Sequence, residues 1–538
     1  MDSPLRPPLV NKTNTGKHDG DQVTDNTLIP LAEHKRSLVV SLEGPSPRKR
    51  VKVQREETIG TDESDDEDSD DEDSLPVVIR RPRNLTTFGI MNMRMSMRPC
   101  AVSHLPSYST RPILESYVSC NRSDMFKLHS MSNASYMSPP YACAYSHNSK
   151  RGENSLLAVT TEEGAVHVLD TSKRHEWDVE PQRCTFQPHE NGVFDVQWSP
   201  DDMRLATVSA DRSLCISTVS KDGITPTARF THHTSTVKCV AWDPTRAGDV
   251  ICSGSRDGMI CVWDLRLGYD MKPVIVIPKS HDTERKVLPR KGKLTAPPAR
   301  GVTSLLFADH GPPSLISSGS YDGILRQWDL RYIDTKRRST RRKPTLKSVA
   351  SAAHVSSDDP TLYRGTRRAR GITSMSPGTG ITTGLLFALS NDSRIHTYDM
   401  ATLEPLSGRT TDPSLDRWSY GDENMRTNSF YVRLAISPCG RWLASGGQKD
   451  GCAYLFDVSG SSKARAHPST CTDARGDAVE LFGQKGEVGA VDWVPGSLAT
   501  CADDGTVRVW RSDIGTYRRC EEDPDKMQWS WCWAREQQ

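Results

Sequence analysis

Residues 253–266 read SGSRDGMICVWDLR, and this stretch decides the fold of the chain. Its Asp257-Gly258 pair is typical of a tight hairpin turn, because glycine adopts the left-handed backbone that such turns require. Apolar residues lie on both sides of the turn, which predicts two short antiparallel strands. The second strand carries Trp263, six positions after the aspartate. The stretch therefore predicts a hairpin with an acidic residue at its turn and a tryptophan near its end.

The same spacing recurs along the sequence, which indicates an internal repeat. Acidic residues in a turn context stand at Glu163, Asp211, Asp257, Asp322, Asp392, Asp450 and Asp504. Six positions later stand Leu169, Ser217, Trp263, Trp328, Tyr398, Phe456 and Trp510, and an aspartate follows in five of the seven units. A hydroxyl residue precedes the acid by four positions at Thr207, Ser253, Ser318 and Thr500. Successive acids are 46 to 70 residues apart, against about 40 to 45 for a bare unit, so the longer units contain insertions.

Each unit predicts several short strands joined by turns, which is the pattern of one blade of a WD-repeat β-propeller. We therefore predict an all-β fold, a seven-bladed WD-repeat propeller with a disordered N-terminal extension. In the most regular unit, a chain of hydrogen bonds is expected to lock the strands together. Its members are His233, Ser253, Asp257 and Trp263.

The same Ser, His and Asp residues match the residue types of a hydrolase triad, but their repeated spacing favours the structural role. The sequence contains no phosphate-binding loop, nucleophile elbow or dinucleotide fingerprint. Its fourteen cysteines form no CxxC pair, so we predict no metal site and no cofactor. Four of them are expected inside strands of the core: Cys239, Cys252, Cys261 and Cys501. The sequence thus predicts a binding protein and not an enzyme.

Residues 1–110 are rich in Pro, Ser, Thr, Asp and Arg, which predicts disorder. Within them Arg48, Lys49, Arg50 and Lys52 form a basic run of the kind that serves as a nuclear import signal, so we expect a nuclear protein. Residues 62–73 hold ten acidic residues among twelve, either a solvated spacer or a mimic of a polyanion. No stretch approaches about eighteen consecutive apolar residues, so no membrane span is predicted.

The propeller is predicted to span residues 111–512, followed by a C-terminal tail over 513–538. Two basic insertions interrupt it at about 268–300 and about 332–370, and both are expected on one face of the disc. The second contains candidate contacts for DNA or an acidic partner: Lys336, Arg337, Arg338, Arg341, Arg342 and Lys343. Because no aromatic residue interleaves with these arginines, nucleic-acid binding is the less favoured interpretation.

Two consecutive units end in the same tetrapeptide, Trp263-Asp264-Leu265-Arg266 and Trp328-Asp329-Leu330-Arg331. Each arginine lies just beyond a strand, so Arg266 and Arg331 are expected to be neighbours on one face of the disc. Two guanidinium groups can hold carboxylates and carbonyl oxygens of a partner bidentately. The alternative is that each arginine only pairs with the aspartate of its own motif.

With these residues in place, the chain resembles the denticleless family of WD-repeat substrate receptors of cullin-4 ubiquitin ligases, over roughly residues 110–512. Three further strings carry the resemblance: PPYAC at residues 139–143, NGVFDVQW at 191–198 and SFYV at 429–432. The resemblance implies that six residues face the damaged-DNA-binding-protein 1 adaptor: Trp263, Asp264, Arg266, Trp328, Asp329 and Arg331.

The resemblance further implies a nuclear receptor that recruits PCNA-bound proteins of DNA replication and the cell cycle for ubiquitination and degradation, in S phase or after DNA damage. The ubiquitin-transferring enzyme would carry the chemistry, while the receptor holds substrate lysines near it. The sequence departs from the family pattern at Ser217-Thr218, in place of the WD pair, and at Lys485, near the expected histidine of the seventh unit. Animal members carry a long C-terminal half with a clamp-binding segment, whereas this sequence ends soon after the seventh unit.

The ends of the chain carry three further expectations. Closure of the ring needs a strand from before residue 139, which we place within 125–130. Residues 112–118 are expected to be helical and to be available to the adaptor. Trp529, Trp531 and Trp533 alternate at strand spacing and either pack on the propeller or bind a partner.

Two competing functions remain at this point. One is a WD-repeat scaffold outside ubiquitin ligases, in a nuclear chromatin or RNA-processing assembly. The other is a direct nucleic-acid binder that uses the basic insertions.

Overall fold

The computed structural model describes the chain between Thr110 and Arg535. Not described within this span are residues 221–222, 247, 268–271, 283–299, 309–313, 331–346, 349–353, 356–357, 364–367, 408–415, 417, 428, 430, 449–450 and 461–477. The chain divides into two compact units, Met1–Ala101 and Val102–Gln538, and all described residues belong to the second. The predicted disorder of residues 1–109, the import-signal residues Arg48, Lys49, Arg50 and Lys52, and the acidic run 62–73 lie outside the described residues.

Short antiparallel strands joined by turns build five separate sheets within the described part of the chain. The first contains β3 (Pro140–Tyr145), β4 (Leu156–Thr161), β5 (Val166–Asp170) and β6 (Cys184–Phe186). The second contains β7 (Val193–Trp198), β8 (Arg204–Ser209), β9 (Leu214–Ser220) and β10 (Gly223–Phe230). The third contains β11 (Val237–Trp242), β12 (Val250–Ser255), β13 (Ile260–Asp264), β14 (Ile275–Ile277) and β18 (Lys347–Ser348).

The fourth sheet contains β15 (Val302–Phe307), β16 (Ser314–Gly319), β17 (Arg326–Asp329) and β19 (His354–Val355). The fifth contains β20 (Ile372–Pro377), β21 (Leu385–Ser390), β22 (Arg394–Asp399) and β23 (Ser419–Tyr420). The described helices are short and lie outside the sheets: α2 (Arg111–Glu115), α3 (His147–Arg151), η1 (Pro244–Arg246), η2 (Leu265–Leu267), η3 (Pro360–Leu362), η4 (Gly380–Thr382), α5 (Ile514–Glu522) and α6 (Pro524–Met527). No helix among them is long and apolar enough to cross a membrane.

The remaining strands form one sheet of ten, which contains both ends of the described chain. Its strands are β24 (Leu434–Ile436), β25 (Trp442–Ser445), β26 (Cys452–Asp457), β27 (Val479–Phe482), β28 (Val488–Val494), β29 (Ser497–Ala502), β30 (Thr506–Ser512), β31 (Trp531–Arg535), β1 (Tyr117–Cys120) and β2 (Met125–Lys127). The strand pairing thus shows an all-β WD-repeat propeller, in which five sheets stand apart and the remaining ten strands form one continuous sheet.

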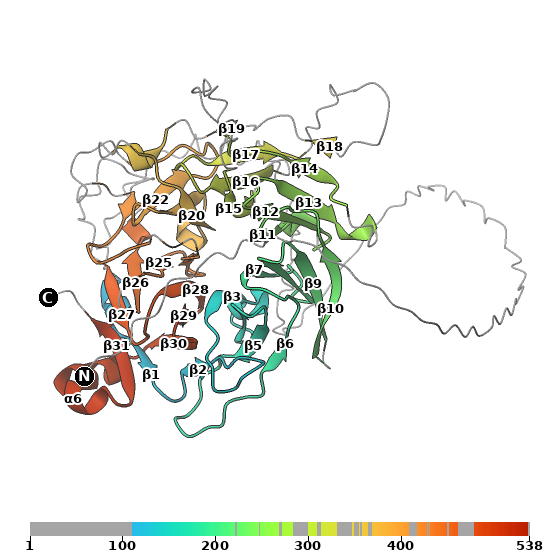
Figure 1. Cartoon of the computed structure of the whole chain (residues 1–538). Coiled ribbons are helices and arrows are strands. Elements are labelled where there is room, and N and C mark those ends of the chain that lie inside the picture. The colour runs from blue at the N-terminus through green and yellow to red at the C-terminus, as the bar shows by residue number, and fades with distance from the viewer. Residues whose placement is uncertain are drawn as a thin grey trace, which may run out of the picture. The chain divides into compact units, whose positions relative to one another are not determined.

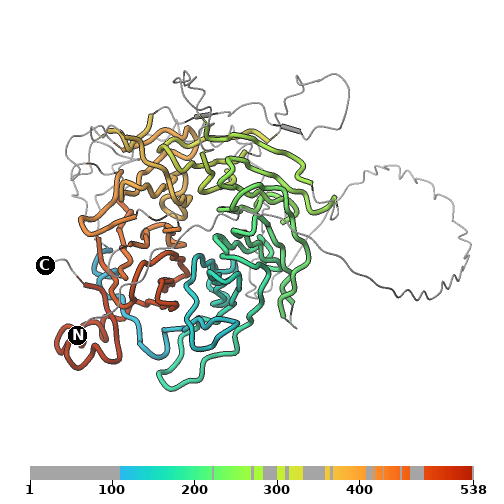
Figure 2. Tube along the Cα trace, in the orientation of Figure 1, coloured from blue at the N-terminus to red at the C-terminus, as the bar shows by residue number. Residues whose placement is uncertain are grey.

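The sheets follow one another around a ring (Figure 1), and the innermost strand of each packs against that of the next. The contacts run from β3 to β7, β11, β15, β20, β24 and β28, and β28 packs against β3 again. Closure joins the two ends of the chain, because β2 and β1 both pair with β30. Figure 2 shows these N-terminal strands in blue beside the red C-terminal ones. The expected closing strand within 125–130 is therefore confirmed as β2, with β1 as a second strand that the sequence did not indicate.

The C-terminal segment is part of this closure. β31 lies in the segment 513–538 that the sequence assigns to a tail, and it pairs with β1 on one side and β27 on the other. The alternation of Trp531 and Trp533 therefore belongs to a strand packed on the propeller, whereas Trp529 is 81% exposed. The expected helix over 112–118 ends earlier, at Glu115, because Tyr117 already belongs to β1.

The ring has two faces, which the strand directions define. We call the turn face the one where the second and third strands of each sheet are connected, as at Asp257-Gly258. We call the exit face the opposite one, where the third strands end, as at Asp264. Because neighbouring strands are antiparallel, each fourth strand starts at the exit face and returns the chain to the turn face.

The two predicted insertions, about 268–300 and about 332–370, lie mostly outside the described residues. The expectation that they share one face of the disc therefore stays a prediction. The basic residues Lys336, Arg337, Arg338, Arg341, Arg342 and Lys343 lie outside the described residues.

The core lies between and within the sheets and follows the apolar positions of the repeat. Cys239, Cys252, Cys261 and Cys501 are each at most 1% exposed and lie in β11, β12, β13 and β29, which confirms the predicted core cysteines. Burial raises the pKa of the Cys239 and Cys252 thiols, which keeps them in the unreactive protonated form.

Candidate functional site

The hydrogen-bond chain predicted for the most regular unit is confirmed for His233, Ser253 and Trp263, and Asp257 lies at ion-pair distance from the histidine. His233 Nε2 lies 2.8 Å from Ser253 Oγ, and Trp263 Nε1 donates to the same oxygen at 3.0 Å. On the other side of the imidazole, His233 Nδ1 lies 3.4 Å from an Asp257 carboxylate oxygen. Ser253 is fully buried, so its hydroxyl is engaged inside the blade and has no access to a substrate. The arrangement therefore joins strands β12 and β13 to the segment that precedes β11, and it does not form a hydrolase triad.

Three other sheets repeat this chain, and the predicted hydroxyl residues Thr207 and Thr500 take part in it, whereas other partners differ from the sequence pattern. In the fourth sheet the hydroxyl belongs to Ser317 and not to the predicted Ser318, and it bonds to His281 Nε2 at 2.9 Å. The hairpin is one residue longer here than in the third sheet, which shifts the position by one. Near the C-terminus Gln484, and not Lys485, takes the place of histidine, and Thr500 Oγ1 donates to it at 2.6 Å. In the second sheet His189 plays this part, with Nε2 2.9 Å from Thr207 Oγ1.

The carboxylate of Asp257 is expected to stabilise the fold in a pH-dependent way. Burial acts to raise the pKa of this carboxyl, but the hydrogen bond and charge of His233 and two backbone N–H groups outweigh it and lower the pKa to about 2. A carboxylate with a lowered pKa stabilises the fold above its unfolded pKa and loses this effect as the pH falls through the folded value. Asp257→Asn should therefore reduce the free energy of unfolding by about 1–2 kcal/mol at neutral pH, and the difference should vanish near pH 2.

Urea unfolding of both proteins across this pH range measures the effect. Asp525→Asn on the exposed helix α6 serves as control and should stay within about 0.5 kcal/mol of the wild type. A pH-independent difference for Asp257→Asn would contradict the assignment.

On the exit face the first of the two WDLR motifs presents its arginine to solvent. Arg266 Nε donates to Asp264 Oδ1 at 2.9 Å and Nη2 donates to Oδ2 at 2.7 Å, while the Arg266 side chain stays 53% exposed. The hydrogen bonds from Arg266 lower the pKa of Asp264. The pairing inside the motif, which the sequence left as an alternative, is thus present, and it orients an exposed guanidinium. Arg331 lies outside the described residues.

The two tryptophans of these motifs do not offer contact surface. Trp263 is 1% exposed and Trp328 is 6% exposed, and their N–H groups donate to Ser253 and Ser317. Their part in any docking is therefore to position the strand ends that carry Asp264 and Asp329.

Exposed apolar side chains accompany Arg266 around the exit face. Leu267 directly follows the arginine and is 67% exposed. Others lie in connections at the same face, between β5 and β6, β7 and β8, β20 and β21, and after β30: Trp177, Met203, Ile381 and Ile514. A charged side chain with an exposed apolar neighbour, as Arg266 has in Leu267, suits a protein–protein interface.

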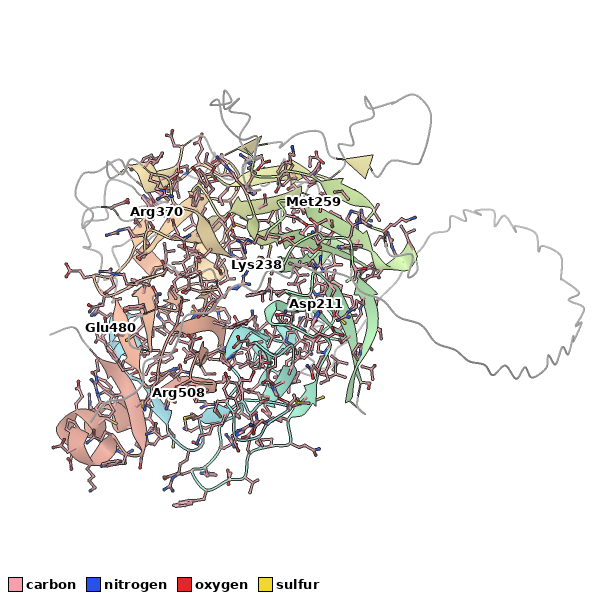
Figure 3. All side chains as sticks on the ribbon, viewed as in Figure 1. Asp211, Lys238, Met259, Arg370, Glu480 and Arg508 are labelled. Carbon is pink, nitrogen blue, oxygen red and sulfur yellow. The ribbon has the colours of Figure 1, made fainter. Side chains whose placement is uncertain are left out.

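At the turn face, aromatic side chains from three distant segments contact one another beside the central opening of the propeller, and we call this cluster the aromatic mouth. The Tyr141 ring stacks on Phe194 with centroids 5.4 Å apart and lies 5.3 Å from the Tyr431 ring. The ammonium of Lys238 lies 3.5 Å from the Phe194 centroid. Burial first, and then Arg433 and Arg256, lower the pKa of Lys238 to about 7. In Figure 3 Lys238 lies beside the opening of the ring.

A cavity of about 510 Å³ lies between the innermost strands. Its carboxylates are already engaged in joining neighbouring sheets: Asp195 accepts the N–H of Val240 at 3.0 Å, and Asp492 accepts the N–H of Tyr145 at 2.7 Å. Asp492 also pairs with Lys150 at 3.0 Å. The cavity is therefore lined by groups that close the ring. The described residues contain no group of three His, Cys, Asp or Glu side chains that could hold a metal ion.

Comparison with known proteins agrees with this architecture. The family model described as WD domain, G-beta repeat, matches residues 180–216, 224–264, 290–329, 426–457 and 478–511. The human denticleless protein homolog is 30% identical over 396 residues, which cover 70% of this chain and 47% of the relative. Denticleless protein homolog B of Xenopus laevis is 30% identical over 393 residues, or 69% and 48% of the two chains. The cell division cycle protein cdt2 of Schizosaccharomyces pombe is 28% identical over 400 residues, or 70% and 69%.

The chain spans about half the length of the animal relatives that it matches. The chain is thus a WD-repeat protein that is similar to the denticleless proteins over about 70% of its length.

Proposed function

We propose that the chain is the substrate-recognition subunit of a cullin-4 ubiquitin ligase, which docks on the damaged-DNA-binding-protein 1 adaptor and recruits PCNA-associated replication and cell-cycle proteins in the nucleus. The observation that carries the proposal is Arg266, an exposed guanidinium that Asp264 holds in place on the exit face, next to the exposed side chain of Leu267. Similarity to the denticleless proteins over about 70% of the chain supports it. We extend the docking site to Asp329 and Arg331 of the second motif and to the strand ends positioned by Trp263 and Trp328.

We also propose that the propeller has seven blades and occupies residues 111–512. The ten-stranded sheet would then be two blades, one built from β24 to β27 and one from β28 to β30 with β1 and β2. The contacts among the innermost strands support this division, because β24 and β28 each take a place of their own in the closed circle. In this arrangement β31 joins the outer edges of the two blades.

The proposed role requires no catalytic group in this chain. A receptor raises the local concentration of a substrate lysine near the ubiquitin-carrying enzyme, and geometry alone provides the acceleration. With the adaptor on the exit face, the turn face with its Tyr141, Phe194 and Tyr431 rings is the surface left for substrates. The import-signal residues Arg48, Lys49, Arg50 and Lys52 would direct the protein to the nucleus, and the basic residues between 336 and 343 would assist contact with DNA.

Co-purification tests the proposal. The full chain and the adaptor, expressed together, should elute as one complex in size-exclusion chromatography and bind with submicromolar affinity in titration calorimetry. A chain that is folded by circular dichroism and elutes apart from the adaptor would exclude the ligase function and leave a WD-repeat scaffold of another assembly.

A further inference from the structure

A continuous arc of arginines crosses the turn face from the third to the fifth sheet. Arg256 lies in the turn after β12, Arg300 lies two residues before β15, and Arg368 and Arg370 lie four and two residues before β20. Each of these positions lies at the turn face, because it either connects second and third strands or leads into an innermost strand. Three successive sheets thus each contribute at least one arginine to the arc.

Backbone contacts show that these positions are adjacent. Gly301, next to Arg300, approaches Arg256 so closely that a Cβ would lie 3.1 Å from the Arg256 Cα. The N–H of Ser320 donates to the Gly301 carbonyl at 3.0 Å. Gly371, next to Arg370, packs against Ser320 so tightly that a Cβ would lie 2.3 Å from its carbonyl carbon. The order along the rim is therefore Arg256, Arg300, the turn that contains Ser320, and Arg370.

An exposed aromatic ring stands in the middle of this arc. Tyr321 follows Ser320 in the turn between β16 and β17 and is 54% exposed. The guanidinium of Arg300 lies over one side of its ring, 4.0 Å from the centroid. Arg300 is itself held by Asp322, 3.4 Å away. The contact fixes the plane of the tyrosine and leaves the rest of the ring open to solvent.

The outer cations of the arc lack acidic partners. Arg256, Arg368 and Arg370 are exposed, and among the described residues no carboxylate lies within ion-pair distance of them. The neighbouring Asp257 is engaged by His233 and by the N–H of Thr234 at 2.8 Å. Arg256 and Arg370 therefore place exposed guanidinium groups on either side of Tyr321, while Asp282 and Asp322 lie beside Arg300 at the centre (Arg370 is labelled in Figure 3).

We propose that this arc binds a single strand of nucleic acid, with a base stacked on Tyr321 and backbone phosphates on Arg256 and Arg370. Cations spread over three sheets cannot converge on one phosphate group, but they match a backbone that repeats its charge. The exposed ring favours nucleic acid over an acidic peptide, because every base has a face that stacks on an aromatic side chain. It favours a single strand over a duplex, whose bases are already stacked. The site is distinct from the exit face and does not depend on adaptor docking.

The sequence alone argued against this arrangement, because no aromatic residue lies among the clustered arginines of the insertions. Tyr321 comes from a different turn than Arg300 and Arg370, and only the fold brings the three together.

Fluorescence anisotropy with a labelled oligodeoxythymidine of about twelve nucleotides tests the proposal on the full chain. Tyr321→Ala should weaken binding about ten-fold, whereas Tyr321→Phe should retain it. Arg256→Ala combined with Arg370→Ala should weaken binding further. The same pair should reduce the slope of log affinity against log salt by about 1.4, because each phosphate that is no longer neutralised lowers it by about 0.7.

Other basic stretches of the chain also attract DNA, so the control removes the same charge elsewhere. Arg518→Ala combined with Lys526→Ala, on the exposed sides of α5 and α6, should change affinity less than about two-fold. Equal losses in the arc variant and the control would overturn the proposal. So would an unchanged affinity of Tyr321→Ala, or a duplex or polyglutamate that binds as tightly as the single strand.

Discussion

Replacing Arg266 and Arg331 together by glutamate is expected to abolish binding to the damaged-DNA-binding-protein 1 adaptor while the propeller stays folded. Arg266 is 53% exposed and engages only Asp264 of its own motif, so the substitution removes no contact between strands. A guanidinium group can hold a partner's carboxylate or carbonyl oxygens bidentately, so the loss of both arginines should remove the charged contacts of the docking site. The new carboxylates add repulsion beside Asp264 and Asp329, and the loss in affinity should exceed about 100-fold.

Surface plasmon resonance at near-physiological salt measures this loss. The matched control is Arg256→Glu combined with Arg370→Glu, which reverses two charges on the opposite face of the ring and should leave adaptor binding within about two-fold. The same two double variants should be tested for binding to oligodeoxythymidine. There the turn-face variant should lose affinity and the exit-face variant should retain it, so each double variant is the control for the other. Adaptor binding that survives the exit-face change, or that falls equally with the turn-face change, would place the docking site elsewhere.

The repeat made the architecture predictable because it reports local geometry. An Asp-Gly turn, two apolar strands and a tryptophan at fixed spacing describe one hairpin, and the structure places Asp257 and Trp263 where that hairpin requires them. The prediction failed where one additional residue shifts the pairing of two strands but leaves the sequence pattern recognisable. Ser318 was predicted where Ser317 forms the hydrogen bond, and Lys485 was considered where Gln484 forms it.

The functional surfaces were predictable only where they lie in one segment. The WDLR motif is contiguous, so its exposed arginine could be named, although burial of its tryptophan could not be inferred from spacing. The aromatic mouth combines Tyr141, Phe194 and Tyr431, which only ring closure brings together. The same holds for β31, whose partners β1 and β27 come from opposite ends of the repeat region. No local pattern encodes such pairs.

Tyr117→Ala is expected to cause the largest loss of stability of any single substitution considered, because Tyr117 lies where the two ends of the chain meet. Its side chain is fully buried and contacts Trp493 and Trp442 edge to face, with centroids 5.9 Å and 6.5 Å apart. Removing a large buried aromatic ring costs about 3–5 kcal/mol, and each aromatic pair adds about 0.5–1.5 kcal/mol. We expect the free energy of unfolding to fall by about 5 kcal/mol, a large part of the roughly 5–15 kcal/mol that is usual for a domain.

The effect should reach beyond the site of the change, because β1 pairs with both β30 and β31 and so connects the first described strand with the last two. A ring that loses this strand leaves the edges of β30 and β31 open, and we expect the amide protons of residues 507–511 to exchange faster in Tyr117→Ala. Urea unfolding and hydrogen exchange measure the two effects. Tyr136→Ala is the matched control, since Tyr136 is 54% exposed and its loss should cost less than about 0.5 kcal/mol. A cost for Tyr117→Ala no greater than that of the control would mean that β2 alone closes the ring and that β1 only covers it.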